Sequence, residues 1–286
     1  LYTKVDVCRE KLLVARSHRI RPGLDDKSLT SWNALMLQAL CDAHMAFGDA
    51  AYLTEAQGIA KFLWEVQRRP DGGLSHSYKN GKSTINGYLE DYSFTAEAFL
   101  RLYEVSFDEI WLNRAVELIN YAHNHFYDSE SGMYWFTSDI DPPLIARKQE
   151  VTDNVIAASN SSMAKALFKA GTLTYSPDLV ERAELMLNNI APHMDYGQSY
   201  SNWGILAQWM SYPFYEVAIT GDSMEKLRRE MGTHFIPNSV LLGANSESDL
   251  PLLKGKFLGD GTIFVCQDKT CQLPVSEVSA ALDQMK

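Results

Sequence analysis

Apolar residues recur at helical spacing over most of this chain, in blocks that come in pairs. In the first clear block, Leu35, Ala39 and Leu40 fall on one side of a helix, which is the pattern of a helix that faces a core. Asp108 has the residue type and the position of an N-cap for a later block. The helices predicted in this way cover residues 32–47 and 51–68, 89–103 and 108–126, 160–173 and 177–192, and finally 199–210.

The first two pairs of helices are copies of one unit. Gly73 matches Gly132 at an offset of 132 − 73 = 59 residues, and the same shift aligns Ala56 with Ala115. Each unit reads as helix, loop, helix and a glycine-containing turn into a strand-like tip. Tandem hairpins of this kind either stack into a solenoid or close into a ring. We predict the ring, a mainly α fold called an α/α toroid, because the first helix of each unit is apolar or small on most sides and suits an inner layer.

The pattern changes after residue 212. Residues 215–220 read as a buried strand, 223–231 as a short helix, and two further strands precede a helix at 276–286. We therefore divide the chain into toroid hairpins at 1–212 and a small α/β appendage at 213–286. The glycine that follows the first of these strands stands alone, so the phosphate-binding pattern G-x-G-x-x-G is missing and no nucleotide site is predicted.

Charge and hydropathy narrow the range of partners. The formal net charge of −10 repels a phosphate backbone and an anionic membrane surface, so we predict neither nucleic acid nor membrane as a partner. The sequence contains no apolar stretch of spanning length and no signal peptide, which favours a cytoplasmic protein. The chain begins at Leu1, so we expect it to be a piece of a longer protein.

The cysteines and histidines predict no cofactor. Cys8 and Cys41 fall within helical patterns and are expected to be small core residues. Cys266 and Cys271 are expected to be reduced thiols or packing groups, with a redox pair as the alternative. Metal-ligand patterns such as H-E-x-x-H are missing, and the two histidines at 123 and 125 would face different sides of a helix, so no metal is predicted.

Polar and aromatic residues gather where the predicted inner helices begin. If these helices run the same way around a ring, their first turns share one rim, and we predict a concave, aromatic-lined pocket there. Acidic and amide groups at helix starts can also be simple caps, which is the alternative for each of them. Aromatic groups contribute nothing to a cap, however, and aromatic faces beside carboxylates suit a sugar ring. The residues concerned are Asp25, Asp26, Trp32, Asn33, Tyr88, Glu90, Asp91, Tyr92, Asn160, Ser161 and Trp203.

Five stretches of the chain resemble the thioredoxin-domain-containing family that includes bacterial YyaL proteins and mammalian spermatogenesis-associated proteins. The C-terminal region of that family is similar to six-hairpin glycosidases and N-acylglucosamine 2-epimerases. The resemblance implies a partial toroid of the six-hairpin type and sugar chemistry. The chain departs from the family in lacking its thioredoxin-like domain, and the loop from Asp153 to Ser161 lacks the glycine and proline of the family pattern. The five stretches are RSHRIRPGLDDKSLTSWNALM, GYLEDYSF, LIARKQEVTDNVIAASNSSMA, PFYEVAITG and FVCQDKTCQLPVS.

Two functions follow from these residues. The first is a carbohydrate-processing domain, with Asp91 and either Asp26 or Asp153 as acid and base for glycoside hydrolysis. Epimerisation would instead use His76, the histidine in the tip of the first unit, as the base. A sugar would stack on Trp32, Tyr92 and Trp203, and Arg147 or Lys148 would bind an acidic group on it.

The second function is a non-catalytic module that docks a thioredoxin-like partner domain. The two hypotheses differ in what they expect of Asp91 and Asp153. A docking module has these carboxylates locked in caps or salt bridges, whereas an enzyme has them reachable by solvent in a cleft.

Overall fold

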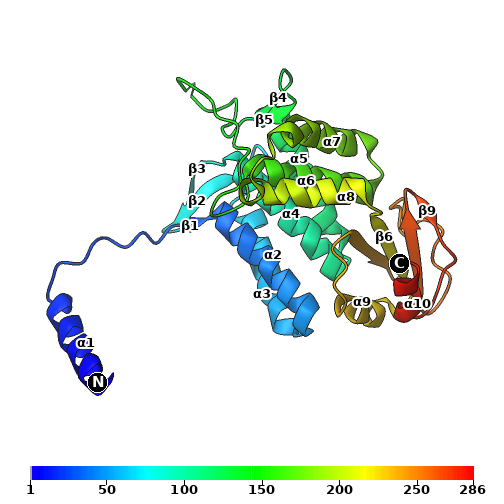
Figure 1. The fold of residues 1–286 in the computed structure, drawn as a ribbon, viewed down its shortest axis with the longest axis horizontal. Coiled ribbons are helices and arrows are strands. Elements are labelled where there is room, and N and C mark those ends of the chain that lie inside the picture. Colours follow the sequence, from blue (N-terminus) through cyan, green and yellow to red (C-terminus); the bar gives the residue numbers. More distant parts are fainter. Residues whose placement is uncertain (1, 143) are drawn as a thin grey trace.

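Helical hairpins form most of the protein. The computed structural model describes residues 2–142 and 144–286. Helices α2, α4, α6 and α8 pack side by side in chain order, and α3, α5 and α7 each cover the outer side of the helix before them (Figure 1). This inner and outer layering confirms the predicted toroid. The helices are α2 (Thr30–Phe47), α3 (Ala50–Glu65), α4 (Leu89–Ser106), α5 (Glu109–Phe126), α6 (Ser159–Thr174), α7 (Pro177–Ile190) and α8 (Ser201–Ser211).

The turn between inner and outer helix has the same build in all three hairpins. Each inner helix ends at a residue with left-handed backbone, and the N-cap of the outer helix follows directly. Asp49 accepts a hydrogen bond from the Ala51 N–H at 2.9 Å, and the predicted cap Asp108 accepts one from the Ile110 N–H at 3.1 Å. The left-handed residues are Gly48, Phe107 and Tyr175, with φ of 71°, 55° and 54°.

The inner helices differ in how much of their surface is buried. Nearly every residue of α4 and α6 is buried, whereas α2 buries one face only. Most sides of α4 carry apolar or small residues, which is why the sequence predicted it to be an inner helix.

Short strands extend the hairpin tips next to the helix starts. Strands β2 (Ser75–Lys79) and β3 (Lys82–Asn86) form an antiparallel hairpin, and β1 (Ser28–Leu29) pairs with β2. The second tip contains β4 (Tyr127–Asp128) and β5 (Met133–Tyr134), also antiparallel. Two 3₁₀ turns, η1 (Ala191–His193) and η2 (Gly197–Tyr200), connect α7 to α8.

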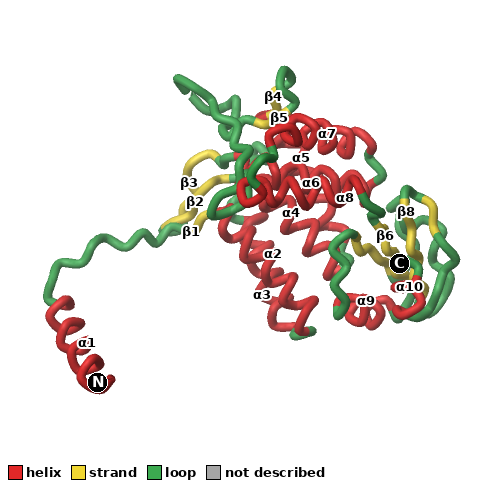
Figure 2. Tube along the Cα trace, in the orientation of Figure 1, coloured by secondary structure: helices red, strands yellow, loops and turns green. Residues whose placement is uncertain are grey.

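A four-stranded sheet lies at the opposite end of the helical layer from β1–β3 (Figure 2). Its order is β7-β6-β8-β9, with β6 and β7 parallel and the other pairs antiparallel. One face joins the core of the hairpins, and the other packs against α9 and α10. The first strand, the short helix, the two further strands and the last helix predicted for this part are confirmed, and the short strand β9 is an addition that was not predicted. The division at residue 212 stays a prediction. The elements are β6 (Tyr215–Thr220), α9 (Met224–Gly232), β7 (Ser239–Ala244), β8 (Thr262–Gln267), β9 (Thr270–Cys271) and α10 (Val278–Asp283).

Two predictions about the cysteines are wrong. Cys8 lies in α1 (Tyr2–Ser17), a helix with no buried residue that stands away from the hairpins in Figure 1, so Cys8 is exposed. Cys266 and Cys271 form a disulfide rather than free thiols, because they lie directly opposite each other on β8 and β9. Cys41 is a core residue as predicted, and burial raises the pKa of its thiol to about 12.

Among the helices that the structure describes, none has both the length and the apolar character needed to cross a lipid bilayer.

Gly243 lets the sheet approach α4 closely, which makes a test of this packing. A Cβ on Gly243 in β7 would lie 2.4 Å from the Phe107 ring, at the end of α4. We expect Gly243→Ala to lower the free energy of unfolding by about 1–3 kcal/mol through overpacking. Gly58→Ala is the control, since Gly58 lies in α3 with open space around it, and it should raise stability by about 0.5–1 kcal/mol. Urea unfolding of both variants checks this, and equal effects would contradict the packing described.

Candidate functional site

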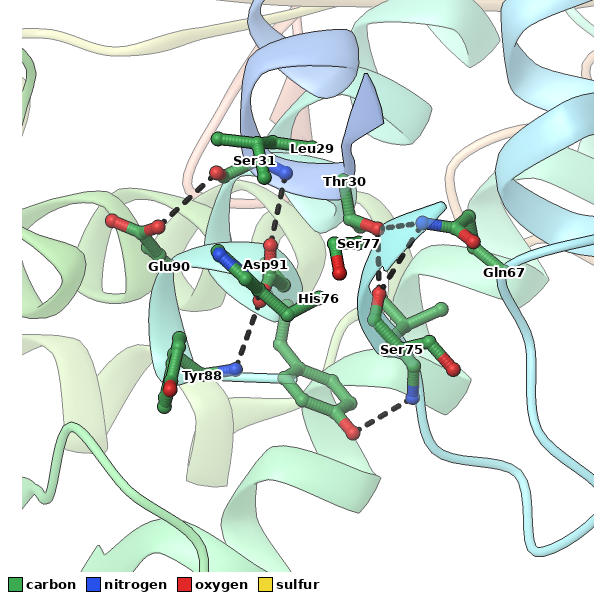
Figure 3. A network of polar contacts seen from close by, with 12 residues as sticks. Leu29, Thr30, Ser31, Gln67, Ser75, His76, Ser77, Tyr88, Glu90 and Asp91 are labelled. Atoms are coloured by element: carbon green, nitrogen blue, oxygen red, sulfur yellow. Dashed lines mark hydrogen bonds and ion pairs between the residues drawn. The ribbon is translucent and has the colours of Figure 1, made fainter. Parts of the chain in front are cut away.

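One carboxylate joins the starts of the first two inner helices. Asp91 is fully buried, and its Oδ1 accepts the Ser31 N–H in the first turn of α2 at 2.9 Å. Its Oδ2 accepts the N–H of Tyr88, the residue before α4, at 2.9 Å (Figure 3). The N-terminal turn of a helix carries free N–H groups and partial positive charge, so a single buried anion satisfies two helices here.

The same carboxylate holds His76. The Nδ1 of His76 lies 2.9 Å from Asp91 Oδ2, and the imidazole is only slightly exposed (Figure 3). This hydrogen bond raises the pKa of His76, against the lowering effect of partial burial. Burial raises the pKa of Asp91, and the hydrogen bonds from His76 and the two N–H groups lower it. Because Nδ1 faces a carboxylate, Nε2 is the ring nitrogen that can exchange a proton with a ligand.

His76 is placed by the tip of the first unit. It lies in β2, whose neighbouring Ser75 carbonyl accepts a hydrogen bond from Thr30 Oγ1 at 2.6 Å. Gln67 Nε2 donates to Thr30 Oγ1 at 2.6 Å, so β2 is tied to the start of α2. These buried polar contacts fix the strand, and with it the direction of the imidazole.

Glu90 adds a second carboxyl group beside the histidine. Ser31 Oγ donates to Glu90 Oε1 at 3.1 Å, and Glu90 remains partly exposed. Burial and the neighbouring Asp91 charge raise the pKa of Glu90. Ligating atoms of His76, Glu90 and Asp91 lie within 4.8 Å of one another.

Those three side chains could hold a divalent metal, and they are the one such group within residues 2–142 and 144–286. Asp91, however, already accepts three N–H donors, which leaves it little capacity to bind a cation. We therefore interpret the three side chains as a group suited to acid–base chemistry rather than to metal binding.

One aromatic side chain packs against the imidazole of His76, and a second packs against the first. The Tyr88 ring lies 4.8 Å from that of His76 and stacks on Phe136 with centroids 5.0 Å apart. The N–H of Leu89 donates to the Phe136 carbonyl at 3.0 Å, which fixes the second tip against the start of α4. Trp32, in the first turn of α2, is 61% exposed and is free to contact a ligand.

A second carboxylate repeats the arrangement for α6 and α8. Asp153 is almost fully buried, and its Oδ1 accepts the Ala158 N–H and the Ser161 hydroxyl, both at 2.9 Å. Its Oδ2 accepts the Asn202 N–H at 2.8 Å and the Ser201 hydroxyl at 3.3 Å. This is the capping role that the sequence analysis left open as the alternative to catalysis.

Several predicted binding residues are enclosed by their own partners. Tyr92 OH accepts the Leu74 N–H at 2.8 Å under the stacked Tyr121 ring. Trp203 is buried, with its Nε1 donating to the Val151 carbonyl at 2.8 Å. Asn160 is buried and hydrogen-bonds both backbone groups of Tyr134 at 2.9 Å. These residues pack inside the protein next to the helix starts, and the polar atoms named here bind partners within the protein.

The remaining predicted residues lie at the edge of the network. Asp25 and Asp26 are exposed and pair with Lys27 and Lys79. Asn33 Nδ2 donates to the Leu29 carbonyl at 2.7 Å.

Arg147 donates to the Thr137 carbonyl and lies 5.1 Å over the Trp135 ring. Lys148 is exposed and pairs with Glu150 at 3.8 Å.

The structure brings together His76, Tyr88, Glu90 and Asp91 as one group, with Ser31 and Phe136 as members that the sequence analysis missed. Ser31 directly precedes Trp32, and only its hydrogen bond to Glu90 in the first turn of α4 identifies it as part of the group. Phe136 lies in the second strand-like tip, and the offset of 59 residues pairs it with Ser77, so the repeat gives no signal for it.

Comparisons with known proteins find relatives of this chain that are named spermatogenesis-associated protein 20. The chain is 26% identical over 293 residues to spermatogenesis-associated protein 20 of Rattus norvegicus and, at the same identity, to that of Homo sapiens. In both cases 94% of this chain is covered, and the chain spans 37% of the length of these curated relatives. No family model matches the chain. The relatives named spermatogenesis-associated protein 20 confirm the resemblance that the motifs indicated.

Among solved structures, the chain is similar to a GH76 α-mannanase of Bacteroides thetaiotaomicron. The TM-score is 0.52 with 13% identity, over 91% of this chain and 70% of that one. At this identity the likeness concerns the fold, and it agrees with the α/α toroid described above.

The two shared carboxylates make a stability test of the rim. Asp91→Asn places an amide donor against the Tyr88 N–H, and Asp153→Asn places one against the Asn202 N–H. We expect each variant to lose about 1–3 kcal/mol of unfolding free energy, because buried N–H groups lose their acceptor. Asp26→Asn is the matched control, and we expect no measurable change because Asp26 is exposed. Chemical denaturation measures all three, and two neutral buried variants would contradict the capping role.

The His76–Asp91 contact has a signature in solution. Because the hydrogen bond to Asp91 raises the pKa of His76, we expect it to titrate above the ordinary value of 6.5. In Asp91→Asn the pKa of His76 should fall, since a neutral amide no longer stabilises the imidazolium. NMR titration of the His76 imidazole resonances in the two proteins measures both, and an unchanged pKa in Asp91→Asn would contradict the contact.

Proposed function

We propose that the rim binds a reducing sugar and that His76 transfers a proton at the carbon next to its carbonyl group. The observation that carries this proposal is the hydrogen bond between His76 Nδ1 and the buried Asp91 carboxylate, with Glu90 within 4.8 Å. This constellation supplies a base, a group that orients the base, and an acid in one place. The toroid fold supports a sugar-type ligand.

Each residue has a separate task. Asp91 keeps the proton of His76 on Nδ1 and stabilises the imidazolium that forms when Nε2 takes a proton from the sugar carbon. Glu90, whose pKa is raised, donates a proton to the carbonyl oxygen as negative charge develops there. The product of this step is an enediol. Delivery of a proton to the former carbonyl carbon gives the aldose–ketose isomer, and delivery to the original carbon from its opposite face gives the epimer. In either case Glu90 takes back a hydroxyl proton as the carbonyl group re-forms. Trp32 and Tyr88 offer flat faces for the C–H side of the ring.

Proton transfer fits this geometry better than glycoside hydrolysis. Hydrolysis uses two carboxyl groups that both reach the substrate. Asp91 and Asp153, which the sequence analysis offered for those roles, are buried and accept hydrogen bonds from helix starts. Asp26 is exposed and paired with Lys79.

A non-catalytic docking module for a thioredoxin-like domain is the second proposal. The burial of Asp91 and Asp153 in helix caps is the observation that favours it. Under this proposal the rim residues stabilise a platform, and substitution of His76 affects stability without any effect on a sugar.

Hydrogen exchange at the sugar distinguishes the two proposals. The chain is incubated in D2O with a panel of aldoses and ketoses, and deuterium next to the carbonyl is followed by NMR. We expect incorporation with the unaltered chain and a loss of about 10²–10⁴-fold in His76→Asn, because the base is removed. The rate should rise with pH as His76 deprotonates, with a midpoint above 6.5 because Asp91 raises the pKa of His76.

The control is His125→Asn, which removes another His–Asp pair, to Asp139 at 2.8 Å, on the outer helix α5. It should exchange at the rate of the unaltered chain. If no sugar exchanges, or if His76→Asn exchanges as fast as His125→Asn, the enzyme proposal fails and the docking proposal stands.

A further inference from the structure

The disulfide lies far from the rim and has an unusual neighbour. Cys266 and Cys271 face each other in the antiparallel pair β8–β9, at the edge of the sheet. Lys256 Nζ lies 3.3 Å from Cys266 Sγ and 3.0 Å from Cys271 Sγ. The other two cysteines, Cys8 and Cys41, are free.

A structural staple explains this disulfide poorly. The stabilisation that a disulfide provides grows with the length of the loop it closes, and this one joins residues five apart in sequence. The hairpin is also paired without it, since the Gln272 N–H donates to the Val265 carbonyl at 2.9 Å and Gln267 pairs with Thr270. The crosslink therefore restricts a segment that the backbone already restricts.

Lys256 is held in place by its own backbone. Its carbonyl accepts a hydrogen bond from Thr220 Oγ1 at 2.8 Å, and its N–H donates to the Leu253 carbonyl at 3.0 Å. These bonds fix the Lys256 backbone, and its ammonium group lies beside both sulfur atoms, where a cation stabilises a thiolate. The acidic group nearest this arrangement is Glu216 on β6, opposite Cys266 in the sheet, and burial raises the pKa of Glu216.

The two cysteines of the disulfide differ in how accessible they are to solvent. Cys266 is 1% exposed and belongs to the core, whereas Cys271 is partly exposed on the two-residue edge strand. An incoming thiolate therefore reaches the sulfur of Cys271, and Cys266 is the leaving group next to the ammonium.

We propose that Cys266, Cys271 and Lys256 form a thiol–disulfide exchange site whose substrate is a dithiol. One thiolate of the dithiol attacks Cys271 Sγ, the Cys266–Cys271 bond breaks, and its electron pair leaves on Cys266 Sγ beside Lys256. The second thiolate of the dithiol then attacks the mixed disulfide, so the dithiol leaves as a cyclic disulfide and Cys271 leaves as a thiolate. Two electrons pass from the dithiol to the cysteine pair, and the two protons of the dithiol go to the two cysteine thiols.

Dithiothreitol tests the exchange on the whole folded chain. The background is Cys8→Ser, and Cys41 is unreactive because burial raises its pKa to about 12. Reduction is timed by alkylation and mass spectrometry of the peptides, with circular dichroism recorded in parallel. We expect complete reduction without loss of helical signal. Lys256→Met should slow reduction about three- to tenfold, because the leaving thiolate loses its cation, while Lys254→Met, two residues away, should not.

Two single-cysteine variants test which sulfur is attacked. With Cys266→Ser, the remaining Cys271 should form a mixed disulfide with glutathione disulfide, and with Cys271→Ser the buried Cys266 should not. The proposal is overturned if reduction requires denaturant, if Lys256→Met and Lys254→Met react alike, or if Cys266 is the residue that forms the mixed disulfide. The first result would identify the disulfide as a structural crosslink, and the other two would remove the roles assigned to Lys256 and Cys271.

Discussion

The rim depends on one interaction, in which a single buried carboxylate accepts hydrogen bonds from the starts of two neighbouring helices. Parallel inner helices bring their N-terminal turns together, and these turns repel one another through like partial charges. Asp91 between α2 and α4, and Asp153 between α6 and α8, each supply the negative charge that two neighbours need. The polar residues at the rim are therefore first of all a consequence of the fold.

The helices and the sheet could be predicted from the sequence because their signals are local. The repeat of 59 residues carries the hairpin turns with it, since Gly48 and Phe107 are separated by that same distance. The cap at Asp108 is a one-residue signal that the structure confirms. The disulfide could not be predicted, because it depends on the register of β8 against β9, and spacing in sequence does not define that register.

The site was predicted only in outline, for a physical reason. A helix start tells which residues lie near the rim, but not which way each side chain turns. Tyr92 and Trp203 carry polar atoms that find partners inside the protein, so they turn inward, while Trp32 remains outside. His76 was found because it lies on a hairpin tip, and its link to Asp91 required the three-dimensional structure.

Helix α4 connects the rim at one end of the helical layer with the four-stranded sheet at the other. Its first turn contains Glu90 and Asp91, and near its last turn Glu104 accepts the N–H of Leu241 in β7 at 3.3 Å while Phe107 packs on the glycine of that strand. Few positions along it can change without disturbing the rim, the neighbouring helices or the sheet. Evolutionary drift should thus be slowest in this segment, and distant members of the lineage will be recognised by it after their outer helices have diverged.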